Sequence, residues 1–350
     1  MDSMQPKKVL ILDILDILRK YTDADHRLSQ AEITDILKNE YGMPADRKSI
    51  KRNIQSLIEF GYDINYSSTE RMTPDKDGKL QKNYLLSDFY LEHEFSDSEL
   101  HLLIDGLLFS KHIPHSQCKE LINKIEGLSS RYFNSRVKYI KTPPNNKSDN
   151  KQLFYTIEIL DEAILKGRQV SFHYNHFAVD KKMHPAVDSN GKPKEYIINP
   201  YQIAATNGRY YLICNYDKYD RISNYRIDRI TDIELLDTPI KPQKKVKGLQ
   251  NGLNLPKHMV EHIYMFAGES IPVTFRAKKY LLDDIMDWFG GDIVLSDESE
   301  DEITVRVTVN DEAMRRWALQ YALHIKILSP VSLANHLKED LRTALKKYGE

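Results

Sequence analysis

The sequence predicts an α+β protein built from several domains. Its 350 residues are enough for two or three domains of ordinary size, and a hydrophobic fraction of 41% is enough for buried cores. Two stretches rich in proline, asparagine, glycine and lysine, residues 141–152 and 238–256, are predicted to be connections. Apolar residues recur with helical spacing before the first stretch, with strand spacing between the two, and with both spacings after the second.

The composition narrows the class of protein. The 50 basic and 51 acidic residues nearly cancel, so any nucleic-acid partner must be held by a local patch. Cys118 and Cys214 lack metal-ligand spacing, so no disulfide scaffold, zinc site or other metal or cofactor is expected. Asp13 and Asp16 interrupt the first apolar run, and no stretch approaches the about 18 apolar residues of a membrane span. We therefore expect a cytoplasmic protein with no membrane partner.

Three helices are predicted near the N-terminus. The first covers residues 7–21. The second begins after Ser29, which forms a capping box with Glu32, and runs to about residue 41. The third has Asp46 as its N-cap and ends at Gly61.

The third helix has two distinct faces. Its apolar residues recur at helical spacing and are expected to be buried: Ile50, Ile54, Leu57 and Ile58. Its other face carries a basic patch that the net charge conceals: Arg47, Lys48, Lys51, Arg52 and Gln55. A charged helix face is often no more than a solvated surface, so the patch alone does not establish a partner.

A hairpin is predicted after this helix, with residues 62–66 paired to residues 83–86 across a polar loop that contains Asp77-Gly78. Three helices followed by a hairpin predict a winged helix-turn-helix over residues 1–87, whose third helix enters the major groove of double-stranded DNA. The candidate DNA-binding residues are Arg47, Lys48, Ser49, Lys51, Arg52, Gln55, Lys79 and Lys82.

Residues 88–150 are predicted to form a helical connector. One amphipathic helix begins at Ser96 or Asp97, and a second covers about residues 116–128. His112 and His115 are close in sequence but lack a third ligand, so surface positions are expected rather than a metal site.

Residues 151–240 carry the strand pattern. Val170, Phe172 and Tyr174 alternate with polar residues, and Asn190-Gly191 and Asn207-Gly208 mark turns. Further strands are predicted at residues 195–204, 209–216 and 223–236. Several short strands with tight turns predict a small β-barrel.

Residues 198–230, INPYQIAATNGRYYLICNYDKYDRISNYRIDRI, resemble the WYL-domain family of bacterial transcriptional regulators. The triad that names this family stands here as Tyr210-Tyr211-Leu212. Its first residue is tyrosine rather than tryptophan, and Ser223 stands where some members carry arginine. The geometry of an anion site is therefore not carried over from the family.

The resemblance extends over most of the chain. TDADHRLSQAEI and DRKSIKRNIQSL are similar to the winged-helix segment of such regulators, and WALQYALHIKILSPVSLANHL is similar to their C-terminal extension. The resemblance implies an SH3- or Sm-like barrel that senses a nucleic-acid or nucleotide-like anionic ligand, in a protein that is usually a homodimer.

The charge of the middle segment agrees with an anionic ligand. Residues 166–229 contain eleven lysines and arginines against six aspartates and glutamates, a net charge of +5. Basic residues interleaved with tyrosines suit phosphates and stacked bases. The candidate ligand-binding residues are Ser171, His173, Tyr201, Tyr210, Arg221, Arg226 and Arg229. Each also has a structural interpretation: strand alternation is expected to bury one of Tyr210 and Tyr211, and Arg229 could pair with Asp228 or another carboxylate.

Residues 256–350 alternate strands and helices in the order of a ferredoxin-like α+β unit. Strands are predicted at 271–276, 303–309 and 324–328, and helices at 278–289, at about 311–321 and after Ser329, which is predicted to cap the last helix. The acidic run 297–302 is predicted to be a solvated hairpin; alternatively, it faces the basic barrel in a dimer.

The sequence thus predicts a regulator that binds an inverted repeat in double-stranded DNA as a homodimer. Motifs of phosphate loops, metalloproteases and serine hydrolases are absent, so no catalytic residues are expected and the chain is predicted not to be an enzyme. The alternative is a sensor in DNA damage or phage defence that does not regulate transcription and binds single-stranded nucleic acid through the barrel.

Overall fold

A computed structural model describes residues 9–74, 80–133 and 150–349. The chain forms two compact units, one of Met1–Ser110 with His115–Asn146 and one of Lys111–Pro114 with Lys147–Glu350. The predictions for Lys79, for the Asp77-Gly78 turn and for most of the connection 141–152 lie outside the described residues.

The first unit begins with three helices, α1 (Leu10–Tyr21), α2 (Gln30–Glu40) and α3 (Arg47–Phe60). Ser29 and Glu32 form the predicted capping box, and the Asp46 side chain accepts a hydrogen bond from the amide of Ser49. Gly61 ends α3 with a φ of 115°, a left-handed conformation that glycine adopts without strain. The helices share one core, formed by Ile14, Leu18, Ile33, Leu37, Ile50, Ile54 and Phe89.

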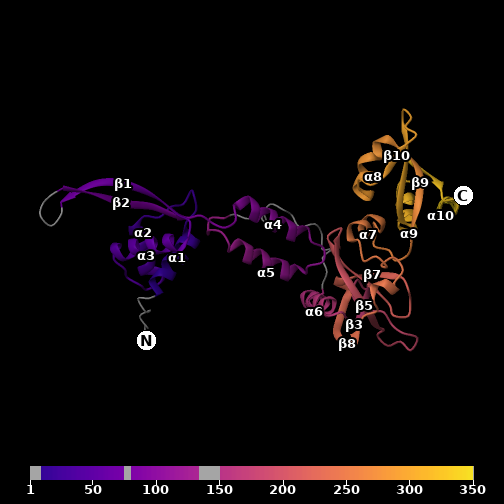
Figure 1. The fold of residues 1–350 in the computed structure, drawn as a ribbon, viewed down its shortest axis with the longest axis horizontal. Coiled ribbons are helices and arrows are strands. Elements are labelled where there is room, and N and C mark those ends of the chain that lie inside the picture. Colours follow the sequence, from indigo (N-terminus) through magenta and orange to yellow (C-terminus); the bar gives the residue numbers. More distant parts are fainter. Residues whose placement is uncertain (1–8, 75–79, 134–149, 350) are drawn as a thin grey trace. The chain divides into compact units, whose positions relative to one another are not determined.

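The hairpin of β1 (Ile64–Pro74) and β2 (Leu80–Leu91) is longer than predicted and differently paired. Ile64 lies opposite Leu91, and Tyr84 lies opposite Glu70, so the predicted pairing of residues 62–66 with 83–86 is wrong. Burial of Phe89 and Leu91 in the helical core decides the register at this end. The rest is an exposed ribbon held by backbone hydrogen bonds, which extends away from its helices (Figure 1).

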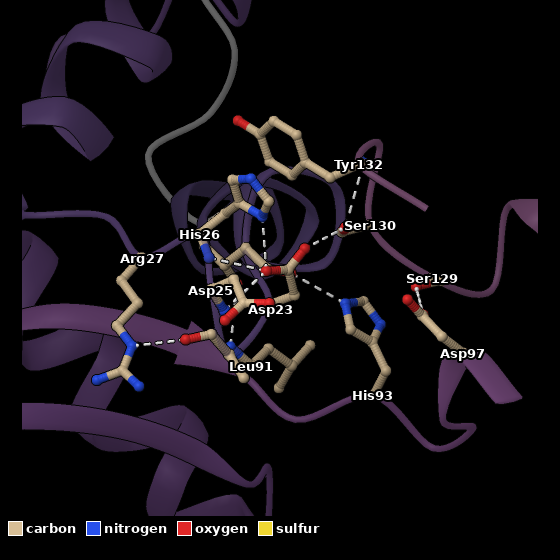
Figure 2. A network of polar contacts seen from close by, with 12 residues as sticks. Asp23, Asp25, His26, Arg27, Leu91, His93, Asp97, Ser129, Ser130 and Tyr132 are labelled. Carbon is tan, nitrogen blue, oxygen red and sulfur yellow. Dashed lines mark hydrogen bonds and ion pairs between the residues drawn. The ribbon is translucent and has the colours of Figure 1, made fainter. Parts of the chain in front are cut away.

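Helices α4 (Asp97–Phe109) and α5 (His115–Glu126) follow, and Ser96 forms a capping box with Glu99. The chain after α5 returns to the loop between α1 and α2. There the hydroxyl of Ser130 donates to Oδ2 of Asp23 at 2.6 Å, and the ring of Tyr132 stacks on His26 with centroids 3.7 Å apart (Figure 2). The first three helices and the end of the connector are therefore joined by side-chain contacts.

The second unit contains a helix that the sequence did not predict, α6 (Leu153–Lys166), which packs on β3, β5 and β8. Its sheet has six strands in the order β4-β3-β5-β6-β7, with β8 paired to β3. These strands are β3 (Arg168–Phe177), β4 (Met183–Pro185), β5 (Glu195–Thr206), β6 (Arg209–Asn215), β7 (Ile222–Arg226) and β8 (Ile230–Pro239). Asn207 and Gly208 form the predicted tight turn with φ values of 52° and 70°.

The predicted closed barrel is wrong for this structure. The predicted strand 223–236 is interrupted by a 3-10 turn, η3 (Ile227–Arg229). Strand β7 before the turn pairs with β6, and strand β8 after it pairs with β3. Strand β5 changes partner along its length, pairing with β3 through Ile198 and with β6 from Asn199. The sheet is therefore bent but open within the described residues, because the turn sends the chain to a different edge.

The predicted connection 238–256 is largely folded. Val246 and Leu249 are fully buried against Tyr201, between η4 (Gln243–Lys245) and α7 (Leu255–Glu261). Only a few apolar residues at irregular spacing anchor this segment, so its sequence shows no helical or strand periodicity from which its folded structure could be predicted.

The remaining residues form a four-stranded antiparallel sheet in the order β10-β11-β9-β12. Its elements alternate as β-α-β-β-α-β, followed by a final helix, around a core that contains Phe275, Phe289 and Trp317. They are β9 (Ser270–Lys278), η5 (Lys279–Leu281), α8 (Leu282–Phe289), β10 (Val294–Ser296), β11 (Glu302–Asn310), α9 (Asp311–Gln320), β12 (Ile325–Ser329) and α10 (Val331–Lys346). Ser329 ends β12 opposite Thr274 and is not the cap of α10, which is Pro330. No described helix has the length and apolar character needed to span a membrane.

Candidate nucleic-acid interface and effector site

Helix α3 separates an apolar face from a basic face. Ile50, Ile54 and Leu57 are buried in the core of the helices. Four cationic side chains are exposed on the other side: Arg47, Lys48, Lys51 and Arg52. This face has the positive charge that contact with phosphates requires.

Several of the predicted DNA-binding residues already have partners. Ser49 donates its amide and its hydroxyl to Asp46, at 2.9 and 2.8 Å, so it belongs to the helix cap. Lys82 pairs with Glu70 at 2.9 Å in the hairpin. The weaker contacts are those of Lys51 with the Tyr84 carbonyl and of Gln55 with Glu59, both at 3.4 Å. Arg47, Lys48 and Arg52 make no such contact with the described part of the chain.

The second unit brings two cationic side chains, those of Arg209 and Arg226, onto one buried carboxylate. Asp228, in η3, is 2% exposed. Arg226 donates to it from Nε at 3.1 Å and from Nη2 at 2.7 Å, and Arg209 donates from Nη1 at 3.0 Å. Burial, and then the charge of Arg226, lower the pKa of Arg209, and the charge of Arg229 acts in the same direction. Two guanidiniums share one carboxylate, and the charge of Arg229 adds to theirs, so this cluster has an excess of positive charge that suits an anion.

Two further features adjoin this cluster. The Arg229 Nε is buried without a hydrogen-bond partner in the described residues. The hydroxyl of Tyr174 accepts a hydrogen bond from the Arg226 amide at 3.3 Å. Sequence reasoning selected Arg226 and Arg229 but missed Arg209 and Tyr174. The position of Arg209 directly before the Tyr-Tyr-Leu triad was the available signal.

The other predicted ligand residues lie elsewhere or are occupied. Tyr201 is buried and donates to the Lys241 carbonyl at 2.8 Å, so it is a core residue. Ser171 is buried within β3. His173 contacts Asp232 at 3.2 Å, a contact that helps lower the pKa of that carboxyl. Arg221 precedes β7, whereas Arg226 ends it, so the two are separated by roughly 16 Å of strand.

Tyr210 contacts the segment between α4 and α5, which belongs to the second unit. Its ring lies 4.1 Å from that of His112, and Nδ1 of His112 is 3.1 Å from the Gly208 carbonyl. His112 is buried, so the expectation of a surface histidine is wrong. Tyr210 and Tyr211 are both half-buried.

The two sheets of the second unit fall in the regions matched by two known domain families. Residues 155–235 match the WYL domain, and residues 269–345 match the WCX domain. The chain is thus a mixed α/β protein that contains a WYL domain and a WCX domain.

Two solved structures resemble the chain over nearly its whole length. Proteasome accessory factor B/C (PafBC) of Arthrobacter aurescens is 13% identical over 99% of this chain, with a TM-score of 0.28, and this chain spans 50% of its length. A CRISPR Cas-related protein is 14% identical over 100% of this chain and 89% of its own, with a TM-score of 0.36. No curated protein matches the chain. Because both TM-scores are below 0.5, the assignment of WYL and WCX domains rests on the family matches alone.

Proposed function

We propose that this protein is a sequence-specific DNA-binding transcriptional regulator whose WYL domain senses an anionic, nucleic-acid or nucleotide-like effector. The observation that carries the proposal is the face of α3, where Arg47, Lys48, Lys51 and Arg52 are exposed opposite a buried apolar face. Three helices followed by a hairpin support a winged helix-turn-helix, in which this helix reads the major groove. The chain binds as a homodimer to an inverted repeat and has no catalytic role.

The effector site is proposed to lie around Arg209, Arg226 and Arg229. Arginine binds phosphates through paired N–H donors, and nearby tyrosines offer surfaces for bases. An effector phosphate competes with Asp228 for the two guanidiniums that this carboxylate holds. Effector binding therefore changes a buried contact in the WYL domain, and the altered population of domain arrangements changes DNA affinity.

A second candidate function rests on the same arginine cluster. A sensor that binds single-stranded nucleic acid through the WYL domain, without regulating transcription, needs this cluster but not the basic face of α3. The two functions therefore differ in which residues duplex binding requires.

The test is fluorescence anisotropy of the full chain with a duplex from upstream of its own gene and with a scrambled duplex. A regulator binds its own sequence more tightly by about a thousandfold or more. Lys48→Ala with Arg52→Ala is expected to abolish duplex binding, whereas Arg226→Ala with Arg229→Ala spares it and removes the effector response. Equal, weak binding to both duplexes, with tight binding of a single strand that depends on Arg226, would favour the sensor instead.

A further inference from the structure

A cavity of about 890 Å³ lies in the second unit, away from the arginine cluster. Its walls come from the start of β7, residues 247–254, helix α7 and the loop before β9. Cavities of this size hold small organic ligands. Arg221 lines it, whereas Arg209, Arg226 and Arg229 do not. It is therefore a different site from the proposed effector site.

Helix α7 forms one wall of this cavity and contacts both domains of the unit. Leu255 and Met259 pack with Ala204 and Ile213 of the WYL sheet. The same helix contacts β11 and α8, which belong to the WCX domain. A ligand in this cavity would therefore touch residues that connect the two domains.

A buried histidine on the wall lacks a hydrogen-bond partner. His258 is 6% exposed, and its Nε2 has no partner in the described residues. Its ring stacks on His262, with centroids 4.1 Å apart, and burial together with His262 lowers the pKa of His258 to about 4. The imidazole is thus neutral near pH 7. A neutral, unpartnered nitrogen at this position costs folding free energy unless a ligand satisfies it.

Two side-chain amides of the wall have only their donors available. The side-chain oxygen of Gln250 already accepts from the Gly248 amide at 3.0 Å, and that of Asn254 accepts from the Lys257 amide at 3.1 Å. Their NH₂ groups remain as donors. These two amide groups suit a ligand that accepts hydrogen bonds, such as a phosphate.

The charges of the wall favour the same kind of ligand. Lys257 pairs with Glu261 at 3.7 Å and Lys247 pairs with Glu269, and both lysines are exposed. The Lys247–Glu269 pair is exposed on both sides, so it is weak and rearranges easily, whereas Glu261 in the other pair is 15% exposed. Arg221 adds a third cation, so the wall has three cations and two carboxylates.

We propose that this cavity binds a phosphate monoester of nucleotide size, with its phosphate near Arg221 and Lys257 and its uncharged end toward His258. The site is additional to the proposed DNA and effector sites and does not depend on them.

The experiment is isothermal titration calorimetry of the full chain with AMP, adenosine and inorganic phosphate as probes. AMP is expected to bind, and adenosine and inorganic phosphate each bind about tenfold more weakly or worse, because each lacks one half of the contacts. Arg221→Ala and Lys257→Ala are each expected to weaken AMP binding about tenfold, the worth of a charge-assisted hydrogen bond. His258→Leu, which keeps the apolar packing, weakens it as well.

Lys244→Ala is the matched control, because Lys244 is an exposed lysine of η4 outside the cavity wall. It should leave AMP binding unchanged. The proposal is overturned if AMP does not bind, if adenosine binds as tightly as AMP, or if Lys244→Ala and Lys257→Ala have the same effect. Binding that is lost in Arg226→Ala but kept in Lys257→Ala would place AMP in the arginine cluster and also overturn it.

Discussion

The guanidinium of Arg226 is held by both oxygens of the Asp228 carboxylate, from Nε at 3.1 Å and from Nη2 at 2.7 Å. Arg209 shares this carboxylate from the start of the neighbouring strand. All three groups are largely shielded from water, so removing one of them would leave a buried charge uncompensated. It orients the side chains that we propose to bind the effector.

Replacing Asp228 should therefore destabilise the protein strongly. Asp228→Ala leaves two mostly buried guanidiniums without their counter-charge and is expected to lower the free energy of unfolding by about 3–5 kcal/mol. The matched control is Asp232→Asn, which removes the charge that pairs with His173 but keeps a side chain that tolerates the left-handed φ of 54°, and it should cost less than about 1 kcal/mol. Urea unfolding followed by circular dichroism measures both. Similar losses in the two variants would contradict the special role of Asp228.

The salt dependence of duplex binding should report the phosphate contacts of α3. Each of Lys48→Ala and Arg52→Ala is expected to reduce the slope of log affinity against log salt by about 0.9, the value for one lost phosphate contact. Both substitutions should lower the affinity for the specific duplex and for the scrambled duplex by similar factors. Lys119→Ala, an exposed lysine of α5, is the control and should not change the slope. An unchanged slope in the α3 variants would show that these cations do not contact DNA phosphates.

The contact between Asp23 and Ser130 should couple the helical connector to the first three helices (Figure 2). A double-mutant cycle with Asp23→Asn and Ser130→Ala is expected to give a coupling energy of about 1 kcal/mol in unfolding experiments. Strict additivity of the two variants would mean that the hydrogen bond contributes nothing.

The same carboxylate makes this coupling depend on pH. Burial of Asp23 opposes ionisation, but hydrogen bonds from Ser130 and His26 outweigh it and lower its pKa below 3.8. A carboxyl with a lowered pKa stabilises the fold above its unfolded pKa, and this stabilisation is lost as the pH falls through the folded value. The coupling energy should therefore persist at pH 7 and decline below about pH 4.

His258 should make the protein less stable in mild acid. Its pKa falls from 6.5 to about 4 on folding, so between these values the unfolded chain binds a proton that the folded chain does not. Stability should be unaffected by this group above about pH 7 and should fall by up to about 3 kcal/mol toward pH 4. His258→Leu should remove this part of the acid dependence. Parallel pH profiles for both proteins would disprove the assignment.

Local signals predicted those parts of the fold that neighbours in sequence decide. The capping box of Ser29 and Glu32, the Asp46 cap and the glycine at 61 placed α2 and α3 within a residue or so of their observed bounds. Each of these contacts is made within one turn of helix, so no distant residue is needed to form it.

The misplaced elements depended on distant partners. The hairpin register follows from burial of Phe89 and Leu91 against helices that precede it by tens of residues. Helix α6 lies against three strands that come after it, and its sequence carries apolar residues on more than one side, which obscures the periodicity.

The basic face of α3 was predictable from the sequence because a single helix displays all of its residues, and their spacing alone decides which face they share. The arginine cluster was only half predictable, since Arg209 meets Asp228 through the pairing of β6 with β7 and the turn that follows. The cavity beside His258 was not predictable at all, because its walls come from four segments that only the packed second unit brings together. Sequence by itself thus determined the local elements and the charge of one surface. Tertiary structure decided the register of the hairpin, the open sheet, the arginine cluster and the cavity beside His258, because burial acts between residues that are distant in the chain.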